Sequence, residues 1–146
     1  MLNMHQETWD GHLGKIETVS QRVPITGPQV ASQPYRAGPS SRKLIDEEIQ
    51  RMLKAEVIEP TSSPWSAPIV LIPKPDGSVR FCVDFRRLNA VTENDSYALL
   101  RIDDCLDSLG KSQFFTTLDA NSGYWKIEVS PEDRDKTTFT FHRGLY

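Results

Sequence analysis

A Pro-Asp-Gly-Ser sequence at residues 75–78, between two short runs of β-forming residues, is the strongest constraint on the fold. Proline presets φ for a turn and glycine tolerates positive φ, so this tetrapeptide is expected to reverse the chain. Residues 69–72 before it are apolar, and apolar and polar residues alternate over 79–84 after it. The pattern predicts a β-hairpin with one buried face and one face open to solvent or a ligand.

An amphipathic helix is predicted just before this hairpin, over residues 41–58. Ser40 or Ser41 is expected to cap its start, and Glu47 and Arg51 have the order of an i,i+4 ion pair. Apolar residues recur there at three- and four-residue steps, which places them on one face. These residues are Ile45, Ile49, Met52, Leu53 and Val57.

The rest of the chain alternates between short elements. Residues 1–40, which contain four prolines, are expected to form an extended leader with a short strand around 15–19. The second region, 41–146, carries the helix and the hairpin. Its later elements are predicted as a loop over 85–100, a helix from Ile102 to Leu109, strands over 114–118 and 124–129, a one-turn helix from Ser130 and a last strand over 137–141. This mixture predicts an α+β fold.

Charge and composition exclude several classes of protein. With 17 Lys+Arg against 20 Asp+Glu, the net charge of -3 argues against a free-standing nucleic-acid-binding protein, because phosphate contacts require basic residues. Cys82 and Cys105 fall in a predicted strand and a predicted helix, which favours reduced thiols over a disulfide framework. The longest nearly apolar run, 67–73, is too short to cross a bilayer, so no membrane partner is expected.

Several blocks of sequence, taken in order, resemble one family. Each is weak alone, but together they are similar to the fingers and early palm of reverse transcriptases from gypsy-type LTR retrotransposons, which are parts of a Pol polyprotein. The resemblance runs from about Gln33 to Tyr146. The blocks are SPWSAP (63–68), VLIPKPDGS (70–78), RFCVDFRRLN (80–89), RID (101–103), LDANSGY (118–124) and DKTTF (135–139).

The resemblance implies the fingers and partial palm of a right-hand polymerase. The full-length enzyme would be an RNA-directed DNA polymerase that adds deoxynucleoside triphosphates to a primer on an RNA or DNA template. It would use two divalent metals, Mg²⁺ or Mn²⁺, about 3.5–4 Å apart. Asp119 matches the first palm aspartate that binds them and is the expected catalytic and metal-binding residue. The paired-aspartate hairpin, thumb and ribonuclease H domain follow later in the family, so this chain alone is expected to be inactive and to bind no metal stably.

The resemblance also assigns residues to the incoming nucleotide. Lys74 and Arg80 match fingers residues that grip the triphosphate, which suits a flexible ammonium and a bidentate guanidinium. Their alternative is a pair of solvated hairpin charges. Tyr124 matches the aromatic residue that packs on the sugar, with Gly123 letting the backbone pass close by. The alternative for Tyr124 is a core aromatic residue in an alternating strand.

The remaining acidic and basic candidates are assigned either to contacts with the template strand or to structural roles. Asp84 and Arg86 match positions near the template strand, and an ion pair anchoring the hairpin base is the equal alternative. Arg87 is interpreted as an exposed charge. Asp103 and Asp104 resemble a metal-binding pair, but negative charge in a first helical turn explains them better.

Two other functions compete with the polymerase role. The first is a non-catalytic module that binds nucleic acid or protein through the basic residues near the hairpin. The second is genomic debris without function, which is expected to leave residues such as Phe139 and Phe141 unburied. The expected location is intracellular, either cytoplasmic (in a virus-like particle for an active element) or nuclear.

Overall fold

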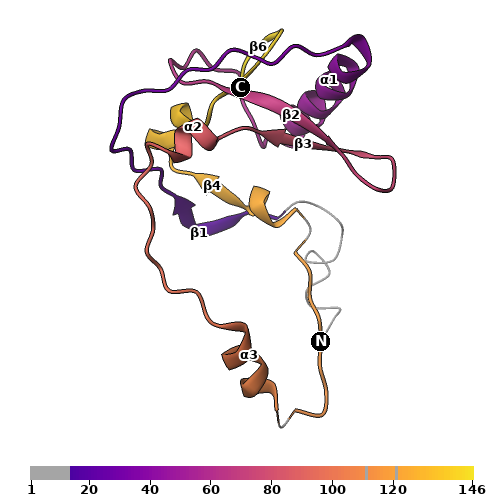
Figure 1. Cartoon of the computed structure of the whole chain (residues 1–146), viewed down its shortest axis with the longest axis vertical. Helices are drawn as coiled ribbons and strands as arrows, with labels where there is room; N and C mark the ends of the chain where they lie inside the picture. Colours follow the sequence, from indigo (N-terminus) through magenta and orange to yellow (C-terminus); the bar gives the residue numbers. More distant parts are fainter. Residues whose placement is uncertain (1–13, 111, 121) are drawn as a thin grey trace.

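The computed structural model describes residues 14–110, 112–120 and 122–146. Its helices and strands gather at one end of the molecule, except for the helix over residues 102–109, which lies at the other end (Figure 1). Helices and strands are mixed along the chain, as the α+β prediction requires. In order they are β1 (Ile16–Gln21), α1 (Pro39–Lys54), β2 (Ala67–Pro73), β3 (Val79–Val83), α2 (Arg86–Asn89), α3 (Ile102–Leu109), the 3-10 helix η2 (Gly123–Lys126), β4 (Ile127–Val129), the 3-10 helix η3 (Pro131–Thr137), β5 (Phe139–Phe141) and β6 (Gly144–Leu145).

A four-stranded sheet in the order β3-β2-β5-β6 forms the centre of the fold. The predicted hairpin is confirmed: β2 and β3 pair antiparallel from Ile69 opposite Val83 to Pro73 opposite Val79. Gly77 has φ +81° at the turn, a conformation that suits glycine. On its other side β2 pairs in parallel with β5, whose sequence lies about 70 residues later. The sheet therefore joins the hairpin to the last residues of the chain.

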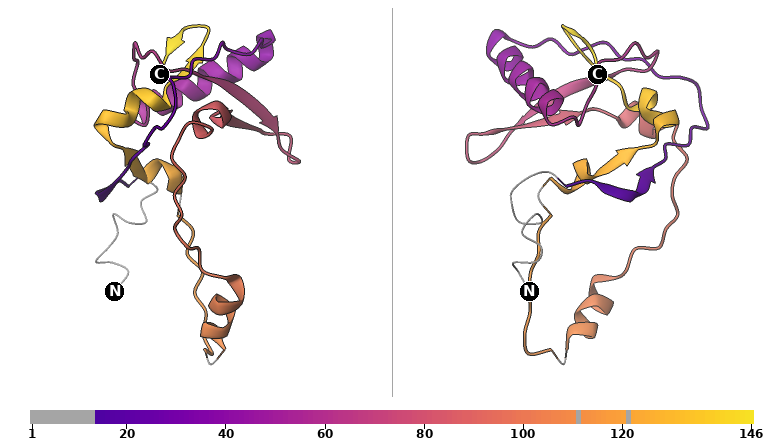
Figure 2. Two further views of the ribbon diagram at one scale, coloured as in Figure 1. Left: turned by 60° about the vertical axis from the view of Figure 1, so that its left-hand side comes forward. Right: turned by 180° about the vertical axis from the view of Figure 1, so that it is seen from behind.

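The hydrophobic core lies between α1 and this sheet (Figure 2). The predicted apolar face of α1 is confirmed, since Ile45, Ile49 and Met52 are buried there. Phe139 and Phe141 are 5% and 6% exposed, so the expectation that they would be unburied is wrong. They are buried because β5 inserts beside β2 under α1, a pairing between distant segments that no local pattern reveals.

The ends and ion pairs of α1 differ from the prediction. The helix begins at Pro39 after Gly38, with no side-chain cap, and it ends at Lys54 rather than at residue 58. Pro39 needs no backbone donor at this first position, so the serines are not required as caps. Arg51 pairs with Glu48 instead of Glu47, through an Nε–Oε2 hydrogen bond of 2.9 Å.

The described part of the leader, residues 14–40, lies against the helices and strands of the second region, here called the module. β1 confirms the short strand expected there and pairs in parallel with β4. Further along, the backbone N–H of Thr26 donates to the Val91 carbonyl at 2.8 Å, and the N–H of Ser32 donates to the Ser66 carbonyl at 2.9 Å. The leader is therefore attached to the second region at several places along its length.

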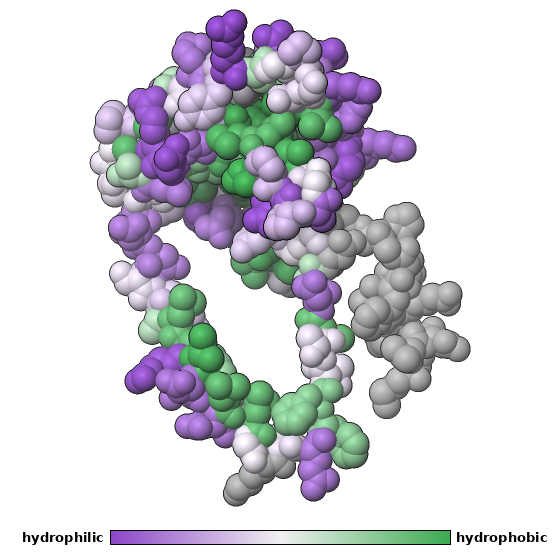
Figure 3. Space-filling model, turned by 45° about the vertical axis from the view of Figure 1, so that its right-hand side comes forward, coloured by the Kyte–Doolittle hydropathy of each residue, from purple (hydrophilic) through white to green (hydrophobic). Residues whose placement is uncertain are grey.

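Residues 93–110 and 112–120, here called the arm, project away from the module (Figures 1 and 2). α3 confirms the predicted helix and ends before Gly110. The strand predicted over 114–118 is wrong, because this segment has extended backbone but no strand partner among the described residues. Apolar side chains of the arm lie on its surface (Figure 3). In the described part of the chain, no helix is long and apolar enough to cross a membrane.

Candidate nucleotide and nucleic-acid site

Lys74 and Arg80 lie on the same face of the β2–β3 hairpin. Ile72 pairs with Arg80 across the strands, and the backbone N–H of Lys74 donates to the Ser78 carbonyl at 2.8 Å. Since side chains two residues apart point to the same face of a strand, the two cations are diagonal neighbours. The hairpin thus presents two exposed cations that form no ion pair with a described residue.

Asp84 and Arg86 form the ion pair that the sequence left as one of two alternatives. Arg86 donates from Nε to Oδ1 at 2.8 Å and from Nη2 to Oδ2 at 2.7 Å, and the Tyr35 hydroxyl donates to Oδ2 at 3.0 Å. The Arg86 guanidinium holds the pKa of Asp84 well below its usual range, and Asp84 raises the pKa of Arg86. The Arg86 side chain is 83% exposed, so it still faces solvent while it is paired.

Arg87 is exposed, as expected, but it is not a free charge. Its Nη1 donates to the Ala31 carbonyl at 2.9 Å and to the Ser32 Oγ at 2.8 Å. These contacts attach the leader to α2. Of the four basic residues near the hairpin, Arg86 and Arg87 are therefore engaged within the chain. Lys74 interacts only electrostatically with the nearby Asp76, and Arg80 forms no ion pair with a described residue.

Tyr124 is fully exposed, so the alternative of a core aromatic residue is wrong. The strand predicted over 124–129 begins only at Ile127, because η2 occupies residues 123–126. The neighbouring ring differs in burial: Trp125 packs against the hydrophobic core, and the Arg51 guanidinium lies 4.6 Å from its ring centroid. Trp125 therefore anchors the turn from which Tyr124 projects.

The structure around position 123 does not require a glycine there. A Cβ at this position would lie 3.5 Å from the Ala120 Cβ, an ordinary contact, and the φ of Gly123 is not left-handed. Glycine has no steric necessity here among the described residues.

Asp119 lies exposed at the end of the arm, on extended backbone rather than at the end of a strand. Among the described residues, no group of three His, Cys, Asp or Glu side chains could hold a metal ion. Magnesium requires octahedral oxygen coordination, and one exposed carboxylate does not provide it. These residues alone therefore do not fit a two-metal centre. Asp103 and Asp104 lie in the first turn of α3, as the scaffold interpretation expected.

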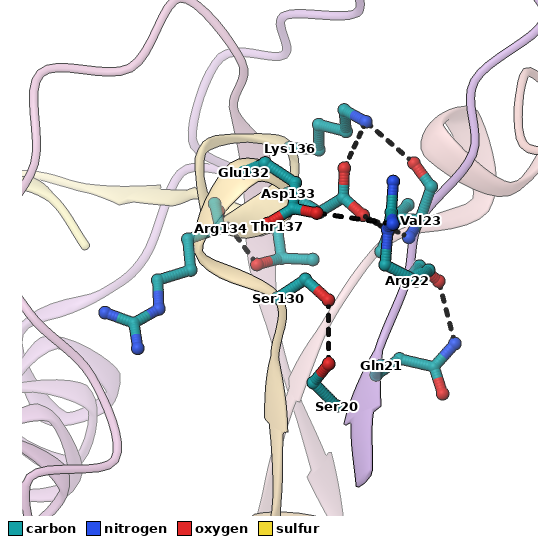
Figure 4. A network of polar contacts seen from close by, with 10 residues as sticks. All are labelled: Ser20, Gln21, Arg22, Val23, Ser130, Glu132, Asp133, Arg134, Lys136 and Thr137. Carbon is teal, nitrogen blue, oxygen red and sulfur yellow. Dashed lines mark hydrogen bonds and ion pairs between the residues drawn. The ribbon is translucent and has the colours of Figure 1, made fainter.

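Asp133 is the residue whose importance the sequence did not reveal. It is 2% exposed, and Arg22, Val23 and Lys136 all donate to its carboxylate (Figure 4). Only a local Asp–Lys spacing of three residues hinted at part of this network. The contacts to the leader cross about 110 positions of sequence and become visible only in the fold.

Foamy viral protease–reverse transcriptases are among the solved structures with a similar fold. The prototype foamy virus protease–reverse transcriptase superposes with a TM-score of 0.81 at 23% identity, over 99% of this chain and 20% of that one. A foamy viral protease–reverse transcriptase in complex with an RNA/DNA hybrid gives a TM-score of 0.82 at 21% identity, again over 99% of this chain and 20% of that one. The fold is thus that of part of a reverse transcriptase, as predicted.

Sequence comparison identifies the family. The profile described as reverse transcriptase (RNA-dependent DNA polymerase) matches residues 72–146, more than half of the chain. Pol polyproteins of the Drosophila melanogaster transposons 412 and opus are 33% identical over 123 residues and 38% identical over 120. These matches cover 80% and 79% of this chain, and 10% and 12% of the relatives.

The chain belongs to the reverse transcriptase family, within the branch found in retrotransposon Pol polyproteins. It spans about a tenth of the length of these relatives. The Pol polyprotein of transposon gypsy is also similar, at 37% identity over 108 residues, 70% of this chain and 10% of that relative. The family predicted from the sequence blocks is therefore confirmed.

Proposed function

We propose that this chain forms the fingers and early palm of an RNA-directed DNA polymerase and contacts the incoming nucleotide there. The observation that carries the proposal is the pair of unpaired cations, Lys74 and Arg80, on one hairpin face. Arg80 would take phosphate oxygens in a bidentate contact and Lys74 would add a second positive charge. Tyr124, exposed on its anchored turn, would pack on the sugar, with Gly123 leaving room for it.

We further propose that the nucleic-acid template passes the base of the hairpin. Foamy viral neighbours of the same fold were solved with double-stranded DNA and with an RNA/DNA hybrid, which supports such a partner. Arg86 would contact the template backbone while Asp84 fixes the orientation of its guanidinium. The substrates in this proposal are deoxynucleoside triphosphates. The chain would act inside the cell, as part of a Pol polyprotein.

Metal binding in this proposal requires more than the described residues. The family as a whole uses divalent metals, and Mg²⁺ or Mn²⁺ would lower the barrier to nucleotidyl transfer by stabilising charge on the attacking and leaving oxygens. Asp119 would contribute one carboxylate. The other ligands would have to come from residues beyond those described here, since no described cluster supplies them.

Nucleotide binding is tested by titrating dATP into isotopically labelled protein and following amide and side-chain resonances. We expect shifts at Lys74, Arg80 and Tyr124, and little response to deoxyadenosine, because the triphosphate supplies the charge. K74Q and R80Q should each weaken binding. Lys54→Gln is the matched control, since Lys54 is a cation at the far end of α1. Equal affinity for dATP and deoxyadenosine, or no effect of R80Q, would refute the assignment.

Catalysis by the 146 residues alone is a separate question. We expect no extension of a labelled primer on an RNA template with either Mg²⁺ or Mn²⁺, because one carboxylate cannot coordinate two metals. Incorporation that disappears in Asp119→Asn would overturn this expectation.

The alternative of a stand-alone nucleic-acid-binding module loses support from the contacts of its cations. Arg86 is paired with Asp84, and Arg87 binds leader carbonyl and hydroxyl groups. The net charge of -3 also opposes tight binding to polyanionic nucleic acid. Gel-shift titrations at low salt separate the two functions, because the module hypothesis requires binding without nucleotide or further protein.

A further inference from the structure

The strand pair β1–β4 cannot be explained by burial. All six residues of β1 are exposed, and the pair belongs to a two-stranded sheet separate from the main one. Two strands alone are marginally stable in water. Some other interaction must therefore hold the leader strand in place.

Buried polar contacts just beyond β1 supply that interaction (Figure 4). The Asp133 carboxylate accepts from Arg22 Nε at 3.1 Å and from the Val23 backbone N–H at 2.8 Å. Lys136 Nζ donates both to Asp133 and to the Val23 carbonyl, the latter at 2.9 Å. Both backbone groups of Val23 are thus bound by side chains of η3. Hydrogen bonds to an ionised, desolvated carboxylate are among the stronger ones in proteins.

Further contacts connect the leader to β4 and to Ser130, the residue that follows it. The backbone N–H of Ser130 donates to the Gln21 carbonyl at 2.9 Å, and the Ser130 and Ser20 hydroxyls lie 3.0 Å apart. At the other end of β1, Lys15 Nζ lies 2.7 Å from Glu128 Oε1. β4 is therefore held along its length by the leader.

η2 ends where β4 begins, so its position follows from both neighbours. The core holds Trp125 from one side, with the Arg51 guanidinium over its ring. The leader holds Ile127 from the other, through its pairing with Ile16. Tyr124 makes no such contact of its own, being fully exposed.

We propose that Asp133 is a positioning residue for the nucleotide site. By fastening the leader to η3 it fixes β1 against β4, and β4 in turn fixes the turn that presents Tyr124. This inference rests on the proposed function only for the role of Tyr124. The mechanical link from Asp133 to residues 124–129 holds or fails independently of what Tyr124 binds.

Hydrogen–deuterium exchange of the full chain tests the link without nucleotide. In Asp133→Asn the amide NH₂ faces at least one of the former donors, so the attachment should fail. We expect amides of residues 16–23 and 124–129 to exchange at least about tenfold faster, as loss of bonds to a buried charge implies. Amides of α1 and β2 should keep their protection. Glu132→Gln is the matched control, because Glu132 also pairs with Arg22 at 3.3 Å but is exposed.

A second measurement, titration with dATP, separates a positioning role of Asp133 from a general loss of stability. In Asp133→Asn, titration with dATP should lose the shift at Tyr124 and keep the shifts at Lys74 and Arg80, whose hairpin lies apart from the leader attachment. If the variant fails to fold, Arg22→Gln removes one donor and leaves the carboxylate bound by Val23 and Lys136; it should give the same pattern more weakly.

Two results would overturn the proposal. One is faster exchange in residues 16–23 with unchanged protection in 124–129, which would mean that the leader does not hold the turn. The other is unchanged exchange in both segments of Asp133→Asn. A lack of dATP binding by the unmodified chain would instead contradict the proposed function and leave the exchange result to be judged alone.

Discussion

Asp133 carries a buried charge that is stabilised by hydrogen bonds and ion pairs. Lys136, the Val23 backbone N–H and Arg22 together lower the pKa of this carboxyl from 3.8 to about 2. A carboxyl whose pKa is lower in the folded state stabilises the fold at pH values above its unfolded pKa. That contribution should be complete above about pH 5 and should disappear as the pH falls from about 4 towards 2.

Chemical denaturation across this pH range measures the contribution. The difference in unfolding free energy between the unmodified chain and Asp133→Asn should be constant from pH 7 to about 5 and shrink below pH 4, because protonation removes the charge that the substitution also removes. Glu132→Gln should show no comparable difference. A gap between the two proteins that stays constant down to pH 2.5 would contradict this assignment.

Gly27 is a second residue whose role follows from the leader's path. A Cβ at position 27 would lie 2.7 Å from Val91 Cγ1 and 2.9 Å from its Cβ, too close for either side chain to be accommodated without movement. Because valine is stiff about χ1, the leader would have to shift. Gly27→Ala should therefore destabilise the chain by about 1–3 kcal/mol.

Gly123→Ala provides the comparison for this measurement. Its Cβ would meet only the Ala120 Cβ at an ordinary 3.5 Å, so thermal and denaturant stability should change by less than about 0.5 kcal/mol. Similar losses in both variants would show that the Gly27–Val91 contact is not a packing constraint.

Among the elements, α1 makes a large contribution to the core. Ile49 is 2% exposed and packs against β2 and β5 residues, so Ile49→Ala should cost about 2–5 kcal/mol through lost burial and a residual cavity. Leu44, on the same helix, is 43% exposed, and Leu44→Ala should cost well under 1 kcal/mol. Urea unfolding followed by circular dichroism gives both values. Equal losses of unfolding free energy in the two variants would show that the Ile49 side chain is not part of the hydrophobic core.

The elements that sequence predicted well have their signals within the element. The hairpin was predictable because the Pro-Asp-Gly-Ser turn sits between its strands, and α1 because its apolar period needs no partner to be recognised. The details of α1 were less predictable. Arg51 selects Glu48 over Glu47 while its guanidinium lies over Trp125, a residue over 70 positions away.

The errors fall where an element depends on a distant segment. Residues 114–118 have strand-like composition, but a strand requires a partner, and none of the described segments forms a strand pair with them. Tyr124 lies in an alternating pattern, yet anchoring of Trp125 by the core turns this stretch into η2. For the site, sequence placed Lys74 and Arg80 on the hairpin correctly, whereas the Asp133 network could not be read because its leader partners lie far away in sequence.

At the scale of the whole molecule, the arm differs from the module that carries it. Leu99, Leu106 and Phe114 are 86%, 60% and 92% exposed, so burial contributes little to order there. α3 has only eight residues, and isolated helices of that length are marginal. Amides of residues 94–110 should therefore exchange orders of magnitude faster than those of α1 and β2, as local opening with few contacts predicts.

Exchange measured by mass spectrometry at neutral pH checks this expectation, with peptides from β2 as the internal reference. Limited trypsin digestion gives an independent view, since Arg101 is exposed in the arm, and the first cleavage is expected there rather than in α1. Protection of the arm equal to that of β2 would show that it is covered in solution.

The parallel pairing of β2 with β5 has a consequence for how the chain is made. Ala67 pairs with Phe139, and the backbone N–H of Thr61 donates to the Leu145 carbonyl, so the central sheet closes only after residues 139–145 have been synthesised. Until then α1 and the hairpin have no Phe139 or Phe141 to cover them. Topologies dominated by such distant contacts fold slowly, and their incomplete forms expose apolar surface. The nascent chain should therefore depend on chaperones until β5 and β6 leave the ribosome.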